Sequence, residues 1–317
     1  MRDYILRRLL VLVPIMLGVS FITFAMFRLV PGDASNFICG FTASPECYEK
    51  VRAELGLDRP WYEQYGDWLG DIVRGDLGRS FFTTLPVSTE LDRRLPVTGQ
   101  LLIMTVLFSL LLGIPPGVLS AVRPGAALDH LARLASVLWL SVPSYWLGIL
   151  SIAFILNWFH WLPPQFALGY VPFFDDPWVN LQQFLLPSLV MALGFAAGIM
   201  RLTRSSLLEV MRNDYIRTAW SKGLRERTVV MRHALRNALI PVVTVIGLQV
   251  GGLIGGAVII ESVFNLNGVG KYALEAILRR DLMVVQSVVL IFAMAFVLAN
   301  LIVDVAYAWL DPRIRYV

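Results

Sequence analysis

The sequence predicts an all-α polytopic membrane protein with six transmembrane helices, both termini in the cytoplasm and a small external segment after the first helix. Of the 317 residues, 57% are hydrophobic and only 16% are charged, whereas about 25% of the residues in soluble domains are charged. The apolar residues gather in six long runs, and Lys and Arg collect in alternate loops between them. The surplus of apolar side chains is therefore expected to face lipid.

The chain begins with one apolar run and one hydrophilic stretch. Residues 1–30 comprise a basic tail and the first span, which is too long for the core of a signal peptide and ends without a good cleavage site. Residues 31–96 are hydrophilic and are expected outside. Within them, 61–72 carry apolar side chains at helical spacing, which predicts an amphipathic helix, either a packed cap or a docking surface. Cys39 and Cys47 also lie here, where an oxidising compartment permits a disulfide, but the sequence leaves their pairing open.

Residues 97–317 form the predicted membrane core, with five further spans. The loops on the side of the two termini hold 16 of the 27 Lys and Arg residues, and the loops on the opposite side hold 10. Acidic residues are most numerous in 31–96. By the positive-inside rule, this asymmetry places both termini in the cytoplasm. The predicted spans are Val97–Val122, Leu131–Phe159, Phe184–Leu202, Leu239–Ser262 and Val284–Leu310.

Two groups of residues inside the spans need a packing or functional reason. The fifth span carries three glycines spaced four apart, which let another helix approach closely, either within this chain or at a subunit interface or pathway wall. Polar side chains are costly in lipid, so those in the last two spans are expected to form interior pairs or to line a pathway. The glycines are Gly247, Gly251 and Gly255, and the polar residues are Gln249, Glu261, Asn300 and Asp304.

The loop between the fourth and fifth spans is basic and has a helical pattern. Residues 201–241 hold nine Lys and Arg residues against three acids. Asp214 is a predicted N-cap for a short helix ending at Lys222, and Gly223 fits the left-handed position that follows a helix. A second helix is expected to begin near 226–228 and to continue into the fifth span. The alternative is a loop that only fixes topology, but scattered lysines would suffice for that.

The sequence lacks the motifs of an enzyme or a metal site. The closest match to a phosphate-binding loop, Gly268–Tyr272, lacks the leading glycine and the hydroxyl residue that the motif requires. We therefore expect no ATP hydrolysis by this chain alone, no catalytic residue and no cofactor on it. No CxxC or HExxH pattern occurs, and the three histidines are scattered. The net charge of +4 reflects topology, so no nucleic-acid partner is expected.

The chain resembles the permease subunits of bacterial ABC importers, in the branch that imports dipeptides, oligopeptides, nickel and related solutes. The similar stretches follow one another in the family's order over nearly the whole chain. They are VPGD (Val30–Asp33), ELGLDRP (Glu54–Pro60), GDLGRS (Gly75–Ser80), DYIRTAWSKGL (Asp214–Leu224), RHALRNALIPVVTVIGLQVG (Arg232–Gly251), NGVGKYALEAILRRD (Asn267–Asp281) and DPRIR (Asp311–Arg315).

The resemblance implies that the loop at about 203–239 carries a coupling helix, which fits a groove of an ATPase subunit and transmits its nucleotide cycle. The general importer pattern has Glu-Ala-Ala before its glycine, whereas this chain has Arg217-Thr218-Ala219. The later Leu-Pro of that pattern is replaced by Leu235-Arg236. Both departures follow the peptide and nickel branch. The residues carried over to the coupling loop are Asp214, Tyr215, Arg217, Thr218, Ala219, Lys222, Gly223, Leu224, Arg236 and Asn237.

The resemblance also implies the partners and the location. A second homologous permease, two cytoplasmic ATPase subunits that bind ATP and Mg, and an extracytoplasmic solute-binding protein are expected, in the bacterial cytoplasmic (inner) membrane. The substrate class stays open among peptides, glutathione, nickel chelates, opines and sugars. A secondary transporter or channel working without ATPases is the alternative, but it predicts inverted repeats and charged broken helices, which the sequence does not show. A membrane-embedded enzyme would need a constellation of reactive residues inside the spans.

Overall fold

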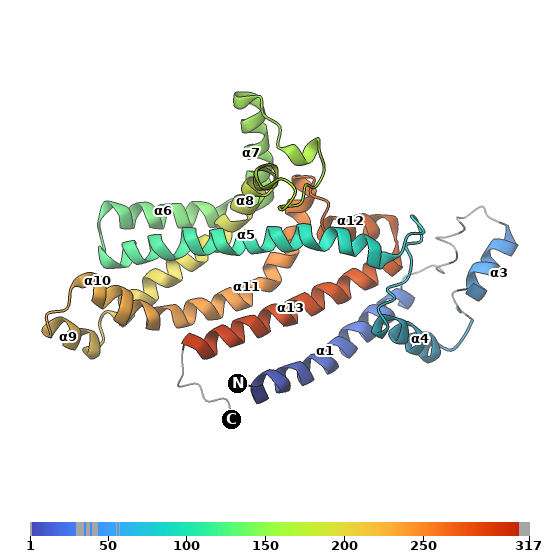
Figure 1. The fold of residues 1–317 in the computed structure, drawn as a ribbon, viewed down its shortest axis with the longest axis horizontal. Coiled ribbons are helices and arrows are strands. Elements are labelled where there is room, and N and C mark those ends of the chain that lie inside the picture. The colour runs from blue at the N-terminus through green and yellow to red at the C-terminus, as the bar shows by residue number, and fades with distance from the viewer. Residues whose placement is uncertain are drawn as a thin grey trace. The chain divides into compact units, whose positions relative to one another are not determined.

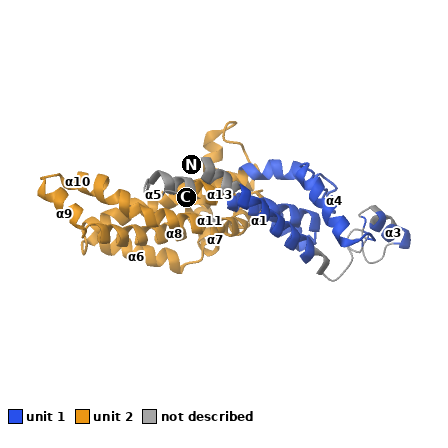
Figure 2. Ribbon diagram, turned by 90° about the horizontal axis from the view of Figure 1, so that it is seen from below, with its two compact units in different colours: residues 1–96, 271–297 blue, residues 97–270, 298–317 orange. Residues whose placement is uncertain are grey.

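The structure, a computed structural model, consists of helices joined by turns and loops in the part of the chain that it describes, with one isolated β-bridge between Arg79 and Pro86. Figure 1 shows the helices, and Figure 2 shows the two compact units into which the chain divides. One unit contains 1–96 and 271–297, and the other contains 97–270 and 298–317. The described residues are 2–29, 35, 39, 44–54, 56 and 58–310.

In the first unit, an amphipathic helix packs on the first apolar helix. Tyr65 and Trp68 of α4 lie against Phe24 of α1, with ring centroids 5.3 and 5.8 Å apart. The hydroxyl groups of Tyr65 and Ser20 are hydrogen-bonded at 2.9 Å. The predicted helix over 61–72 is thus confirmed, and its apolar face forms a cap on α1. The helices that begin in this unit are α1 (Arg2–Leu29), α3 (Pro45–Glu54), α4 (Trp61–Val73), α5 (Val87–Val122) and α13 (Leu282–Leu310), and most of α12 (Val269–Arg279) also belongs to it.

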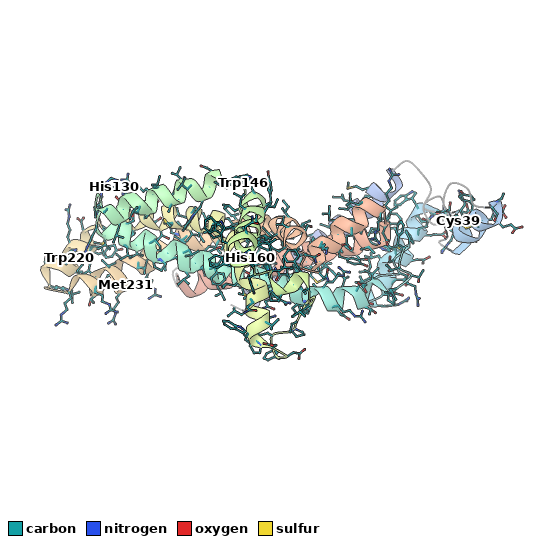
Figure 3. All side chains as sticks on the ribbon, turned by 90° about the horizontal axis from the view of Figure 1, so that it is seen from above. Cys39, His130, Trp146, His160, Trp220 and Met231 are labelled. Carbon is teal, nitrogen blue, oxygen red and sulfur yellow. A yellow bond between two sulfur atoms is a disulfide. The ribbon has the colours of Figure 1, made fainter. Side chains whose placement is uncertain are left out.

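The two cysteines in the segment that follows α1 are joined. Cys39 and Cys47 form a disulfide, with their Cα atoms 6.1 Å apart, which is within the usual range for such bonds. Figure 3 marks Cys39 beside the short helix α3. The bond closes a loop of eight residues in a segment that has few apolar side chains of its own.

In the second unit, a core of apolar side chains joins α5, α8 and α11. Leu101 of α5, Phe184 of α8 and Ile260 of α11 are fully buried in it. Each helix is rich in Leu, Val, Ile and Ala, which suits both the helix and the apolar surroundings. The remaining elements are α6 (Ala127–Ser141), α7 (Ser144–Phe159), a 3₁₀ turn (Pro164–Phe166), α8 (Pro177–Val210), α9 (Asp214–Ser221), α10 (Glu226–Thr228), a π-helical turn (Val229–Ala234) and α11 (Leu235–Val263).

Four helices of the described chain are long and apolar enough to cross a membrane. They lie in Val87–Val122, Pro177–Val210, Glu226–Gln249 and Leu282–Val303. A fifth is obtained if the bent pair α6 and α7 is one span. The described apolar part of α1, Leu10–Met26, is shorter. The all-α membrane class is therefore confirmed, with four to five candidate spans.

The predicted span 131–159 is not one continuous helix. Helices α6 and α7 diverge by 99° at a short break. Val142 has an extended backbone there, with φ −102° and ψ 124°, because the residue before a proline disfavours the α conformation. Pro143 then leads directly into α7. Gly148 lets α7 approach α11, since a Cβ at this position would lie 3.0 Å from the Phe264 ring.

Candidate functional site

Helix α9, the predicted coupling helix, begins one residue earlier than we predicted. Asn213 is its N-cap, with an extended backbone, and its side chain makes no capping hydrogen bond. The predicted N-cap, Asp214, is instead the first helical residue, and its carboxylate lies 3.5 Å from the Arg217 guanidinium. The prediction was wrong because Asn and Asp are both good N-cap residues, and the sequence does not distinguish between neighbours of these types.

The C-terminal end of α9 has the geometry that the sequence predicts. Gly223 has φ +73°, a left-handed conformation that glycine adopts without a steric penalty. Its amide donates to the carbonyl oxygen of Trp220 at 2.9 Å, and the amide of Leu224 donates to that of Ala219 at 3.4 Å. These bonds satisfy carbonyl groups at the end of the helix. The chain therefore reverses sharply at Gly223 and returns to the membrane core.

One face of α9 is buried in an apolar cluster that we name the α9 socket. Ile216 and Ala219, one turn apart on α9, insert into it. The cluster joins the end of α5, the end of α8 and the start of α11, so α9 rests on three long helices. The socket consists of Ala121, Leu207, Val229, Val230, Ala234 and Ala238.

One residue of the predicted contact set lies on the buried face of α9. Ala219 is 7% exposed and packs against the α9 socket, and its contact with another subunit stays a prediction. Leu224 is half-buried beside the same cluster. The remaining predicted residues are exposed, namely Asp214, Tyr215, Arg217, Thr218, Lys222, Gly223, Arg236 and Asn237.

Two exposed apolar residues in this loop were missed by the sequence analysis. Trp220 is 41% exposed on α9, and Met231 is 54% exposed on the π-helical turn. Figure 3 shows both at the same end of the molecule. The spacing of Ile216 and Ala219 indicates which face of α9 is buried. Trp220 directly follows Ala219 and so points away from that face, and this could have predicted its exposure. A basic surface with aromatic and Met side chains suits a protein partner.

The α9 loop enters α11 through a π-helical turn. Residues Val229–Ala234 form this turn between α10 and α11, so the predicted second helix, near 226–228 and onward, is confirmed in its location. Two of its side chains, Val229 and Val230, are buried in the α9 socket. Turns of this type change the register of a helix and are frequent at functional sites.

A cavity of about 280 Å³ lies at the bend between α6 and α7, and we name it the elbow cavity. Gln249 of α11 lines it, together with residues of α6, α7 and α8. Gln249 also lines a second, much smaller cavity, and Phe195 borders both. No charged side chain is among the lining residues described. The elbow cavity is lined by Trp139, Leu140, Val142, Ser144, Leu147, Val190, Met191, Gly194, Phe195 and Gln249.

Glu261, a second polar candidate, lies in the protein interior. Its side chain is fully buried, and its carboxylate accepts a hydrogen bond from the Thr98 hydroxyl at 2.6 Å. The Thr98 hydroxyl in turn accepts the Val269 amide at 2.8 Å. A Cβ on Gly268 would lie 2.3 Å from this carboxylate. Gly268 is thus required for close packing around Glu261, and Glu261 joins three segments rather than facing an open cavity.

The glycines of the fifth span face different surroundings. A Cβ on Gly247 would lie 2.6 Å from Val303 of α13, so this position packs within the chain. Gly255 is exposed and has nothing within 4 Å of such a Cβ. Gly251 is half-buried, as is Asn300. The side chain of Asp304 lies outside the described part of the chain, so its predicted pairing with Asn300 stays a prediction.

Sequence analysis also missed a buried ion pair on the same side of the second unit as α9. Asp129 of α6 and Arg204 of α8 lie 2.8 Å apart. They are 75 residues apart in the chain. In the sequence each is a single charged residue near the end of a span, and nothing there indicates that the two are paired. The only local indication was an acid among basic neighbours, directly before an apolar run.

Two family models match this chain. The model described as binding-protein-dependent transport system inner membrane component matches residues 113–316. The N-terminal model of the same membrane components matches residues 1–102. The chain belongs to this family.

Individual relatives of this permease match it over its full length. It is 43% identical over 316 residues to a putative peptide transport system permease protein from Brucella abortus (strain 2308). It is 38% identical to a dipeptide transport system permease protein from Alkalihalophilus pseudofirmus, over 333 residues. It is also 38% identical to a glutathione transport system permease protein from Escherichia coli (strain K12), over 316 residues. In all three, the alignment covers 100% of both chains.

Membership in the family determines the class of function. The permease is a multi-pass inner membrane component of an ABC importer. In this family a solute-binding protein delivers the substrate, and ATPase activity resides in partner subunits. A secondary transporter or channel working without ATPases is not favoured.

Proposed function

We propose that this permease imports short peptides as one of two homologous permease subunits. In this proposal α9 couples the permease to two cytoplasmic ATPase subunits, which bind ATP and Mg, while the chain itself holds no cofactor. An extracytoplasmic solute-binding protein delivers the peptide. The observation that carries the proposal is the exposed helix α9, which lies in the basic loop 201–241 and is seated through its apolar face on the ends of three long helices.

The socket gives α9 the mechanical properties that coupling requires. Because Ile216 and Ala219 are enclosed by residues of α5, α8 and α11, a displacement of α9 moves the ends of those helices with it. Close-packed side chains transmit such a displacement because interiors have low compressibility. A partner that binds two arrangements of α9 with different affinity would thereby favour one arrangement of the spans.

The exposed face of α9 indicates the chemistry of the partner's groove. Arg217 on α9 is strongly exposed, and so are Lys222, directly after α9, and Arg236 on α11. Within 201–241 basic residues outnumber acids by nine to three. We infer a groove with acidic side chains for these cations and an apolar recess for Trp220, because potentials at protein interfaces are complementary.

Short peptides are the substrate that the comparisons favour. The printed names of the relatives refer to peptide, dipeptide and glutathione transport, and glutathione is itself a small peptide. The elbow cavity, with Gln249 and Ser144 among apolar neighbours, offers polar contacts without a fixed charge. A cavity with such a lining is suited to the passage of a peptide and not to binding it tightly. Selection among peptides would then be made by the solute-binding protein.

We further infer six transmembrane helices with both termini in the cytoplasm. This count takes the four candidate spans, one of which includes the start of α11, and adds α1 and the broken span formed by α6 and α7. The distribution of Lys and Arg supports the orientation. After mild reduction, a membrane-impermeant maleimide should label Cys39 and Cys47 from outside intact cells. Labelling only in inside-out vesicles would reverse the orientation.

The coupling role is tested in vesicles that contain the purified importer. The permease, its homologous partner permease and the ATPases are reconstituted, and the binding protein is added with tritiated dialanine or, separately, tritiated glutathione. We expect ATP-dependent uptake of at least one of these peptides. Arg217→Glu should reduce the co-purification of the ATPases and abolish uptake. Arg74→Glu, an equally exposed charge reversal in the external segment, should do neither. Uptake without ATPases, or full activity of Arg217→Glu, would overturn the proposal.

A further inference from the structure

The ends of α5, α6 and α8 are joined by a buried ion pair. Asp129, in the first turn of α6, is 1% exposed. One carboxylate oxygen, Oδ1, accepts a hydrogen bond from Nε of Arg204 at 2.8 Å, and the other, Oδ2, accepts one from Nη2 at 3.1 Å. This is the two-pronged arrangement in which Arg binds a carboxylate with a defined orientation.

Two more donors complete the surroundings of the carboxylate. The Ser120 hydroxyl of α5 donates to Oδ1 at 2.5 Å, and the Gly125 amide donates to Oδ2 at 2.9 Å. Arg204 Nε also lies 3.0 Å from the Ser120 hydroxyl. Arg133 is a looser neighbour, half-exposed and 3.5 Å from Oδ1. We call the set of Ser120, Gly125, Asp129 and Arg204 the Asp129 junction.

The Asp129 junction lies directly beside the α9 socket in the chain. Ser120 precedes the socket residue Ala121, and Arg204 lies one helical turn before the socket residue Leu207. Among the described residues, α6 contributes no side chain to the apolar cluster that holds α9. At this end, α6 is therefore linked by hydrogen bonds and an ion pair to α5 and α8, two of the three helices on which α9 rests.

The far end of α6 is the bend at the elbow cavity. Trp139 and Leu140 of α6 line that cavity, and the chain turns by 99° directly after them. Figure 1 shows α6 running beside α5 from the α9 end to the bend. One rigid helix thus extends from the Asp129 junction to the cavity that Gln249 also lines.

The chemistry of the junction determines how α6 can move. Packed apolar helices slide past one another by small shear motions. A two-pronged ion pair resists sliding, because both of its hydrogen bonds lengthen when either helix shifts. Since Asp129 bonds to α5 and α8 together, α6 is fixed to the pair of helices that α9 displaces.

We propose that Asp129 and Arg204 are positioning residues for coupling, because their ion pair makes α6 move with α8 when α9 is displaced. The movement then reaches the elbow cavity at the far end of α6. This inference rests on the proposed role of α9, and it adds the route by which the motion reaches the interior.

The decisive variant replaces the ion pair with apolar side chains of similar size. Exchanging a buried ion pair for such residues is often neutral for stability, whereas removing one partner leaves an unpaired buried charge. Asp129→Leu combined with Arg204→Met should therefore insert and assemble. We expect normal co-purification of the ATPases and a near-normal basal ATP hydrolysis. Uptake of tritiated dialanine or glutathione per assembled complex, and the stimulation of ATP hydrolysis by the binding protein, should fall about tenfold or more.

Two further variants make every outcome informative. Arg133→Leu, beside the junction but half-exposed, is the matched control and should leave uptake per complex unchanged. Arg204→Lys retains the charge and loses the two-pronged geometry, so uptake per complex should fall by about threefold or more. If the double variant does not assemble, Arg204→Lys decides the question by the same measurement.

Several results would overturn the inference. Wild-type uptake per complex in the double variant, or in Arg204→Lys, would show that the junction only stabilises the fold. If the double variant inserts but no longer co-purifies with the ATPases, the junction is needed for binding of the ATPases and not for transmitting motion from α9 to α6. The proposed role of α9 is tested separately. If that role is wrong, the Arg217→Glu variant binds the ATPases normally, and this result does not depend on the behaviour of the junction variants.

Discussion

The side-chain amide of Asn237 donates a hydrogen bond to the phenolic oxygen of Tyr215 at 2.8 Å, across 22 residues of chain. Tyr215 lies on α9 and Asn237 on the first turn of α11, so this bond ties α9 directly to α11. The α9 socket holds the adjacent face of α9 through Ile216 and Ala219. The hydrogen bond and the socket together fix the orientation of α9 relative to α11.

Removing this bond should change coupling more than stability. Tyr215→Phe keeps the ring and deletes only the hydroxyl. Because the bond is exposed, we expect a loss of about 1 kcal/mol or less in the free energy of unfolding. Uptake per assembled complex should fall several-fold, because α9 is then held by its apolar socket alone. The control is Ser221→Ala, since that hydroxyl donates to the Arg217 carbonyl of the same helix. Equal uptake by the two variants would contradict the prediction.

Gly223 should tolerate no other residue without loss of coupling. Its φ of +73° favours glycine, and a Cβ there would touch nothing within 4 Å, so the penalty is one of backbone conformation alone. Gly223→Ala should cost about 1 kcal/mol. Gly223→Pro should uncouple transport while the protein still inserts, because proline fixes φ near −65° and removes the amide that donates to Trp220. Uptake and ATP hydrolysis are measured in the same vesicles.

The matched control for this change is in the external segment. Gly75 has φ +86° and equally open surroundings, so Gly75→Ala introduces the same kind of strain far from α9 in the sequence. We expect it to leave the ratio of peptide imported to ATP hydrolysed unchanged. A normal ratio in Gly223→Pro would refute the role of this turn.

The features that could be predicted from the sequence are those that depend only on residues close together in the chain. The left-handed Gly223, the helix over 61–72 and the apolar helices follow from local patterns that require no distant partner. A proline such as Pro143 inside an apolar run indicates a distortion of the helix, but it does not determine the size of the bend. The 99° angle depends on how α7 packs through Gly148 against Phe264.

The missed features depend on contacts between distant segments. Asp129 and Arg204 are 75 residues apart, and no local pattern connects two single charges at that distance. Ala219 was assigned to the contact surface by resemblance, although its spacing from Ile216 already placed it on the buried face. Glu261 was left open between packing and a pathway, and the Thr98 hydroxyl that decides the matter is 163 residues away.

The glycines of α11 should differ in their tolerance of substitution. Gly247→Ala places a Cβ 2.6 Å from Val303, and overpacking of this kind costs about 1–3 kcal/mol. Gly255→Ala enters open space and should be neutral or slightly stabilising, since alanine is favoured over glycine in helices by about 1 kcal/mol. Thermal unfolding of the isolated permease in detergent measures both. A lower melting temperature for Gly255→Ala would contradict the open surroundings.

Tyr272, on α12, should titrate later than an ordinary tyrosine. Burial raises the pKa of Tyr272 to about 12, and the negative charges of Asp281 and Glu90 act in the same direction, against the opposing Arg94. The Arg94 guanidinium lies 4.4 Å above the phenol ring. In an unfolded chain the same phenol has a pKa of about 10. The folded state therefore retains a proton that the unfolded state loses between these values.

The sign of the effect on stability follows from this difference. The contribution of neutral Tyr272 is fully present below about pH 10 and is lost as the pH rises towards 12, because the unfolded state binds fewer protons over that window. The measurement is the phenolate absorbance of the wild type minus that of Tyr272→Phe. In the folded permease this difference should develop only near pH 12. In denaturant it should develop near pH 10, and a folded-state difference at that lower pH would show that Tyr272 is not buried.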